Sequence, residues 1–316
     1  MNLRKSCLPP GWYPRDKSSI TDFLRPYEGG ISGGISNSGT KFTSKTANFG
    51  PNTELNAPGL SLPAFAAIAP HAGWYYSGPA AAQAVSSLDR NAETIVVVGG
   101  HLPSGMPVLE SPEDGVITPL GTMEIDREFR DEFLKKVRTR PDSYADNTVE
   151  VLLPMVHYFF PRGKVVLLRF PADLSSFEAG KILAEIASEL GRKAVFLAST
   201  DLTHYGENYG FSPRGRGKKA LEWVKNTNDA AFIAAILDGD PQRVLKRAEE
   251  DSSACSAGSV LGALGFAAFG LHSGTQYQSR LLDYYTSADV HMPNNIEGEV
   301  PDSFVGYAAV AMSQVS

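Results

Sequence analysis

Short apolar runs alternate with helical segments along most of the chain, and this alternation limits the folds that are open to it. The runs predict buried strands at 64–69, 94–98, 164–170 and 194–198. Helices are predicted between or after these runs, at 79–88, 126–137 and 175–190. Strands and helices that alternate in this way form a sheet with parallel pairs and with helices on both faces. The sequence therefore predicts an α/β fold.

Two further features bear on the sheet and on the number of domains. The segments "SRLLDYYTSADV" at 279–290 and "SFVGYAAVAM" at 303–312 predict strands joined by a loop, which makes the sheet mixed although largely parallel. Residues 29–52 are rich in Gly, Ser, Thr and Asn and show no apolar period, so we interpret them as a surface excursion rather than a linker. Residues 1–316 are then expected to form a single domain.

Charge, hydropathy and cysteine content exclude several classes of protein. A net charge of −6 with no basic face argues against binding to nucleic acid or to anionic membranes. The longest strongly apolar stretch, Val260–Leu271, is interrupted by glycines and is too short to span a bilayer. The start of the chain carries prolines where a signal peptide needs an apolar region, and two cysteines cannot form a disulfide framework. We therefore expect a cytoplasmic protein.

Ionisable residues follow three of the predicted strands. His71 follows the first strand, His101 the second, and Asp201 and His204 the fourth. In open α/β sheets, sites form outside the carboxyl ends of the strands, so these side chains are expected to meet in one crevice. His71 is expected to be partly exposed in a strand-to-helix turn, before a helix whose N-cap would be Ser77. A single histidine is more often structural, but three strand ends together predict a site.

Cys255 adds a sulfur ligand or a nucleophile to this group. Asp240 and Pro241 are predicted to open a helix that runs to about Asp251, and another helix begins just after Cys255. Unpaired N–H groups at a helix N-terminus stabilise a thiolate. A buried, inert cysteine beside an apolar helix fits the same position.

Two chemistries fit these residues. Two histidines and a cysteine with an open position would suit zinc, copper or iron, with Asp201 or His204 as an orienting group or proton carrier. Alternatively, Cys255 attacks a carbonyl with a histidine as base and Asp201 orienting that base. Trp74, Tyr75 and Tyr76 line a pocket or belong to the core, and Glu150 faces solvent or enters the site. No HExxH, paired CxxC, Walker A or GxSxG motif decides between these readings.

Several segments together resemble one family. They are "GWYP" (11–14), "IAPHAGWYYSGPAAA" (68–82), "ITPLGTMEID" (117–126), "STDLTHYG" (199–206), the region of residue 255, and "VGYAA" (305–309). In this order they resemble the Memo family, whose prokaryotic members are called AmmeMemoRadiSam system protein B. That family is similar in fold to the class III extradiol dioxygenases. The resemblance implies one α/β domain of that kind, with its site in the crevice described above.

The resemblance also implies a ligand set. The family's two histidines and cysteine fall on His71, His101 and Cys255, which implies a bound iron or copper ion, or zinc. Its catalytic Asp and His fall on Asp201 and His204. One departure affects the crevice, because Asn147 stands where the family often has a histidine, whereas Glu150 is kept. These two residues are expected near the rim, and with Trp74 and Tyr76 they form the predicted substrate-binding set.

The family resemblance indicates the reaction less clearly than the fold. The leading hypothesis is a metal-binding, redox-active protein with an unknown substrate. A cysteine-nucleophile hydrolase using Cys255 with a histidine and Asp201 is the first alternative, and a non-catalytic module that binds a peptide or partner is the second. Family association implies AMMECR1-type and radical SAM proteins as partners, and the small-molecule or peptide ligand stays unknown. Charge and hydropathy predict neither nucleic acid nor a membrane as a partner.

Overall fold

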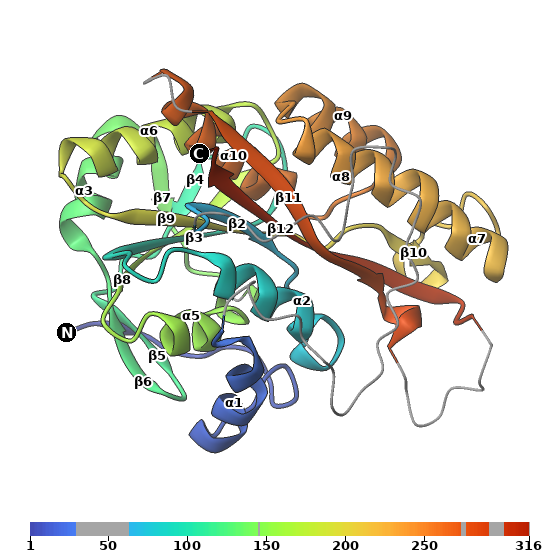
Figure 1. The fold of residues 1–316 in the computed structure, drawn as a ribbon, viewed down its shortest axis with the longest axis horizontal. Coiled ribbons are helices and arrows are strands. Elements are labelled where there is room, and N and C mark those ends of the chain that lie inside the picture. The colour runs from blue at the N-terminus through green and yellow to red at the C-terminus, as the bar shows by residue number, and fades with distance from the viewer. Residues whose placement is uncertain (30–62, 145, 273–275, 291–299, 316) are drawn as a thin grey trace.

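A mixed sheet of nine strands lies at the centre of the computed structural model (Figure 1). The structure describes residues 1–29, 63–144, 146–272, 276–290 and 300–315. The predicted excursion at 29–52 therefore lies, except for residue 29, outside the described residues. The strand order across the sheet is β10-β12-β2-β9-β3-β8-β4-β7, and β11 pairs with β12.

The central strands are parallel and almost wholly buried. In their order across the sheet they are β2 (Ala66–Ala69), β9 (Ala194–Ser199), β3 (Thr94–Leu102) and β8 (Lys164–Pro171). Alternate residues pack into opposite cores, as Val97 and Val96 of β3 do. Because both faces of the sheet are covered, these strands read as continuous apolar runs, and all were predicted from that pattern.

The outer strands make the sheet mixed, as predicted. β12 (Ser303–Gln314) is antiparallel to β2 and also to β10 (His204–Gly206) and β11 (Tyr277–Thr286). At the other side, β4 (Val108–Glu110) is antiparallel to β8 and parallel to β7 (Thr139–Pro141). A separate small sheet of β1 (Leu3–Arg4), β5 (Gly115–Thr118) and β6 (Gly121–Glu124) holds the N-terminus, and the sequence did not predict it.

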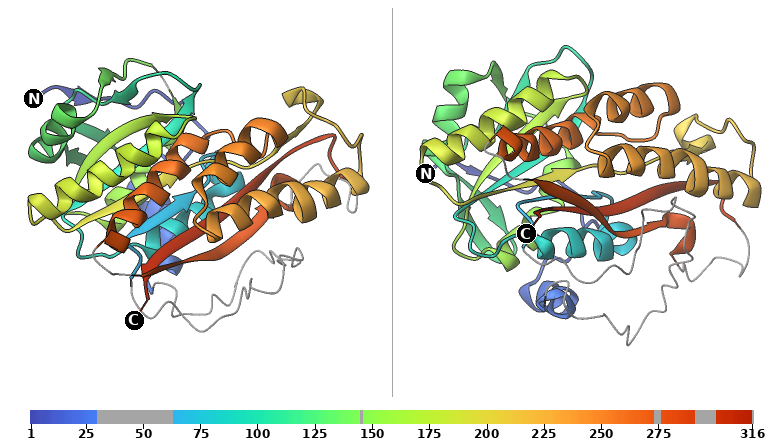
Figure 2. Two further views of the ribbon diagram at one scale, coloured as in Figure 1. Left: turned by 90° about the horizontal axis from the view of Figure 1, so that it is seen from above. Right: turned by 45° about the horizontal axis from the view of Figure 1, so that its top comes forward.

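Helices cover both faces of the large sheet (Figure 2). One core is built with α1 (Lys17–Leu24), α2 (Trp74–Ser87) and α5 (Leu153–Phe159). The opposite core is built with α3 (Arg127–Lys136), α6 (Ser175–Glu189), α8 (Asp229–Leu237), α9 (Pro241–Asp251) and α10 (Ala257–His272). Two further helices are short, α4 (Asn147–Glu150) and α7 (Lys218–Trp223). A π-helical turn at Val224–Asn228 joins α7 to α8. Within the described ranges, no helix has both the length and the hydropathy needed to cross a bilayer.

Helix α2 begins five residues earlier than predicted, at Trp74 instead of residue 79. The prediction treated Ser77 as the N-cap and Pro79 as a first-turn residue, but Gly73 is the N-cap and Pro79 lies inside the helix. Tertiary contacts hold the extra turn, because the Trp74 amide donates to the carbonyl of Trp12 at 2.8 Å. Ser77 donates its hydroxyl to the carbonyl of Ala72 at 3.0 Å and does not cap the helix.

Candidate metal centre

The turns that follow β2, β9 and β3 lie side by side because these three strands are parallel neighbours. His71 follows β2, Asp201 follows β9, and His101 is the second-last residue of β3. Cys255 comes from the far side of the sequence, two residues before α10, and its amide donates to the carbonyl of Asp201 at 3.2 Å. The structure thus brings together the residues that sequence reasoning placed in one crevice.

Three ligand-type side chains converge at this point. His71, His101 and Cys255 each offer one atom, and these atoms all lie within 4.8 Å of one another. The Sγ of Cys255 is 3.2 Å from the Nε2 of His71, and the two imidazole rings meet edge to face with centroids 5.0 Å apart. This arrangement offers two nitrogen ligands and one sulfur ligand to a single point.

His71 is held on its other sides by neighbouring side chains. Its Nδ1 lies 2.6 Å from the hydroxyl of Ser199, and its backbone amide donates to Oδ1 of Asp201 at 2.7 Å. The side chain is 1% exposed, which corrects the expectation of a partly exposed residue. Because Nδ1 is occupied by Ser199, Nε2 is the nitrogen that faces Cys255.

His101 is positioned by two residues that sequence reasoning missed. Its Nδ1 is 3.1 Å from Oδ2 of Asp146, and the same carboxylate oxygen is 3.2 Å from the guanidinium of Arg169. The sequence analysis did not single out Asp146. Arg169 offered a signal that was available, because it is a charged residue in the run "KVVLLRF" that predicts a buried strand.

The protonation states follow from these neighbours. Burial alone would lower the pKa of both histidines, but nearby anionic groups reverse this effect. Cys255 and Asp201 raise the pKa of His71, and Asp146 with Cys255 raises the pKa of His101 to about 10. Burial would likewise raise the pKa of the Cys255 thiol, yet the two histidines hold it well below its ordinary value. The site therefore favours a thiolate beside imidazolium rings. A metal cation can bind there if it displaces the protons from the ring nitrogens that face it.

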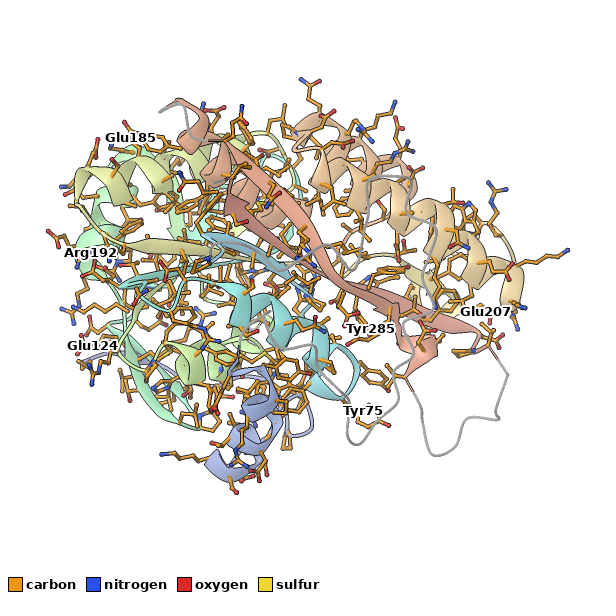
Figure 3. All side chains as sticks on the ribbon, viewed as in Figure 1. Tyr75, Glu124, Glu185, Arg192, Glu207 and Tyr285 are labelled. Atoms are coloured by element: carbon orange, nitrogen blue, oxygen red, sulfur yellow. The ribbon has the colours of Figure 1, made fainter. Side chains whose placement is uncertain are left out.

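A cavity of about 750 Å³ opens over this group. Of the predicted residues, it is lined by His71, His101, Asp201, His204, Tyr76 and Asn147. Tyr75, for which the sequence left pocket and core open, also lines the cavity. Aromatic residues that were not predicted complete the wall, namely Trp12, Tyr209 and Tyr307. Tyr75 is 53% exposed and extends from the first turn of α2 toward the outside of the molecule (Figure 3). Buried Asp201 has a raised pKa because burial outweighs the effect of His71.

Two of the predicted substrate-binding residues have other partners. Trp74 is 4% exposed, donates its indole N–H to the carbonyl of Val151 at 2.9 Å, and does not line the cavity. Glu150 is also buried away from the cavity, where it holds the N-terminal segment by accepting hydrogen bonds from Ser6, Cys7, Leu8 and Tyr13. Asn147 does line the cavity, and its amide donates to the carbonyl of His71 at 2.9 Å.

Comparisons with known proteins agree on one family. The model of the family described as Memo-like protein matches residues 40–311. A MEMO1 family protein of Pyrococcus abyssi is 31% identical over 275 residues, which cover 82% of this chain and 90% of the relative. A MEMO1 family protein of Methanococcoides burtonii is 33% identical over 259 residues, which cover 79% of this chain and 87% of the relative.

A solved structure of an uncharacterized protein from Escherichia coli K12 also matches. It is 16% identical with a TM-score of 0.38, and the match covers 77% of this chain and 98% of that chain. This likeness is too weak to support an inference about the site, and the expected likeness to class III extradiol dioxygenases stays a prediction.

Proposed function

This chain belongs to the Memo family, and from that premise we propose that it binds a transition-metal ion through His71, His101 and Cys255. The observation that carries the proposal is the convergence of three ligand atoms within 4.8 Å beneath a cavity of about 750 Å³. The proposed occupant is iron or copper, with zinc as the ion that the same donors also suit. The substrate is proposed to enter through the cavity.

The donor set fits such an ion. In a tetrahedral site with metal–nitrogen bonds of about 2.1 Å and a metal–sulfur bond of about 2.3 Å, nitrogen and sulfur lie about 3.6 Å apart. The 3.2 Å between His71 Nε2 and Cys255 Sγ is close to that value. The second nitrogen of each ring has its own partner, Ser199 for His71 and Asp146 for His101, as is usual for histidines that bind metals.

The cavity residues would bind substrate and move protons around this centre. When bound, iron or copper would supply redox chemistry that the side chains lack. His204 lines the cavity, and its Nδ1 lies 3.1 Å from the carbonyl of Leu202, which can only accept a hydrogen bond. In the neutral ring Nδ1 therefore carries the proton, and Nε2 is left as a base. We propose His204 as the proton acceptor, with Asp201 holding the turn of His71.

Metal content of single variants tests this proposal. Wild-type protein loaded with Fe²⁺, Cu⁺ or Zn²⁺ and then desalted is expected to retain about one ion per chain, by elemental analysis. His71→Ala and Cys255→Ser should lose that ion, because each removes one of three ligands. Cys7→Ser is the matched control, since Cys7 is the other free cysteine and lies outside the group. Equal loss in Cys7→Ser and Cys255→Ser, or no ion in wild type, would contradict the proposal.

The close pair of His71 and Cys255 also favours a second candidate, a hydrolase in which Cys255 is the nucleophile. A distance of 3.2 Å between thiol and imidazole is what such catalysis needs. Alkylation of Cys255 by iodoacetamide separates the two functions. If the thiolate binds metal, added ion should slow alkylation and a chelator should restore it; a nucleophile without metal should react at one rate in both conditions.

The family association extends to partners, and AMMECR1-type and radical SAM proteins are proposed on that basis alone. Co-purification with tagged chain checks this proposal.

A further inference from the structure

His101 adopts a backbone conformation that needs support from its surroundings. Its φ is 57°, in the left-handed region that side chains other than glycine seldom adopt. The ladder between β3 and β8 shifts register between Gly99 and Leu102, so His101 lies in an irregular part of its strand. The residue before His101 must be glycine, because a Cβ at Gly100 would overlap the side chain of Ser256. The residues that hold His101 in this conformation therefore determine where the imidazole ring of His101 lies.

Asp146 contacts both the ring of His101 and the turn that follows. One carboxylate oxygen, Oδ2, is 3.1 Å from His101 Nδ1. The other, Oδ1, accepts the amide of Thr148 at 2.8 Å and also the Thr148 hydroxyl, which fixes the carboxylate as the N-cap of α4. Asp146 is therefore held by its own turn while it contacts the histidine.

Arg169 links this carboxylate to the backbone of the strand. Its guanidinium is 3.2 Å from Oδ2 of Asp146, and its Nε donates to the carbonyl of Gly100 at 3.0 Å. A third contact, at 3.3 Å, goes to Asp142. Arg169 is 5% exposed, and a planar guanidinium with several fixed partners is a rigid support. The guanidinium of Arg169 thus holds the peptide bond before His101 directly and the ring of His101 through Asp146.

The turn that begins at Asp146 also contacts the second histidine. The side chain of Asn147 donates to the carbonyl of His71 at 2.9 Å. The hydroxyl of Thr148 accepts the amide of Gly100 at 3.2 Å. Successive residues of one turn therefore contact the segments that carry His71 and His101, which fixes these segments relative to each other.

We propose that Asp146, anchored by Arg169, is a positioning residue that orients His101 so that Nε2 faces the other two ligands. This inference rests on the proposed metal-binding function. Asp146 accepts a hydrogen bond from the Nδ1–H of His101. That bond keeps the proton on Nδ1 when Nε2 binds the ion, and it prevents the ring from turning out of the cavity. A carboxylate in this relation to a metal-binding histidine also makes the imidazole more basic toward the metal.

Cobalt titration tests the proposal without any assay of activity. Co²⁺ bound to a thiolate absorbs in the near ultraviolet, so its affinity can be measured directly for wild type and variants. Asp146→Ala should weaken Co²⁺ binding by about 10- to 100-fold, the range typical of residues that orient metal-binding histidines. Asp146→Asn keeps an N-cap and a hydrogen-bond acceptor but removes the charge, so it should weaken binding less and secures the test if Asp146→Ala fails to fold.

Asp142→Asn is the matched control, because Asp142 is the other carboxylate paired with Arg169 and it does not contact His101. This variant should bind Co²⁺ within about threefold of wild type, as expected if metal affinity depends on contact with the ring. Wild-type affinity in both Asp146 variants would overturn the proposal, and so would an equal loss in Asp142→Asn.

A second readout separates this proposal from the proposed function. In metal-free protein labelled with ¹⁵N-histidine, the hydrogen-bonded Nδ1 proton of His101 should resonate downfield. It can be assigned by its loss in His101→Gln, and it should disappear in Asp146→Ala. Its absence from folded wild type would overturn the positioning role. Wild type that binds no Co²⁺ but shows this proton would overturn the proposed function and leave the orientation of His101 by Asp146 supported.

Discussion

Asp229 is a buried acid directly beneath the turn that carries Asp201 and His204. Its Oδ1 accepts the amide of Thr203 at 3.1 Å and also the Thr203 hydroxyl, and its Oδ2 accepts the hydroxyl of Tyr284 at 2.7 Å. Burial raises its pKa to about 7, although these hydrogen bonds and the charge of Lys225 act in the opposite direction. At neutral pH the group is therefore near its midpoint.

This raised pKa predicts a pH-dependent stability at one residue. In the unfolded chain the acid loses its proton near pH 4, whereas the folded protein keeps it to about pH 7. Its contribution is thus complete below pH 4 and is lost as pH rises to 7, with an upper limit of about 4 kcal/mol. Asp229→Asn mimics the protonated acid at every pH, so its stability should exceed that of wild type by more at pH 8 than at pH 5. Urea unfolding at both pH values measures this difference, and parallel pH profiles of the two proteins would rule it out.

At the scale of elements, the sequence predicts best where one pattern has one structural explanation. The runs at 94–98 and 194–198 were predicted correctly as buried parallel strands. A short run of consecutive apolar residues is typical of a strand in a sheet that is covered on both faces. The start of α2 was mispredicted because Pro79 and Ser77 carry the usual signals of a helix start, while the extra turn depends on Trp12, sixty-two residues earlier in the chain.

The candidate site shows the same limit. His71 and His101 could be predicted because strand ends meet at one edge of a sheet. The local sequence places Cys255 only near a helix start. Its grouping with His71 came from the chemistry of the two side chains and from the family resemblance, because the contact between them depends on how α10 packs. The role of Asp146 had no local signal, since a carboxylate before a turn looks alike whether it caps a helix or also contacts a histidine.

The contact between α6 and α10 gives a prediction about packing. A Cβ at Gly180 of α6 would overlap the backbone carbonyl of Gly262 in α10. A backbone group cannot move aside as a flexible side chain can, so Gly180→Ala should destabilise the fold by about 2–3 kcal/mol. Ser188→Ala lies on an exposed position of the same helix and should change stability by less than about 0.5 kcal/mol. Equal unfolding midpoints for the two variants in urea would contradict this account of the helix contact.

At the scale of the whole molecule, the first 29 residues are part of the domain and of its cavity. Leu3 pairs with Gly115 in the small sheet, and the side chains of Ile20 and Leu24 are fully buried in one core. Trp12 lines the cavity. Between Leu3 and Trp12, the chain is fixed by hydrogen bonds that Ser6, Cys7 and Leu8 donate to Glu150. The segment is thus bound to the sheet at both ends and in the middle.

A fragment that begins at residue 63 should therefore be much less stable than the full chain. It would lose the buried side chains of Tyr13, Ile20 and Leu24 and the hydrogen bonds that the N-terminal segment donates to Glu150. Each lost core side chain costs about 2–5 kcal/mol, so the Tm should fall by on the order of 10 °C or more.

The matched control is full-length chain cut at a protease site engineered between residues 40 and 50, which breaks the chain and keeps both pieces. Because the N-terminal piece is held by contacts rather than by the chain, the cut protein should elute as one species with a Tm near that of uncut protein. A fragment from residue 63 that melts at the temperature of the full chain would show that the N-terminal segment is dispensable for the fold.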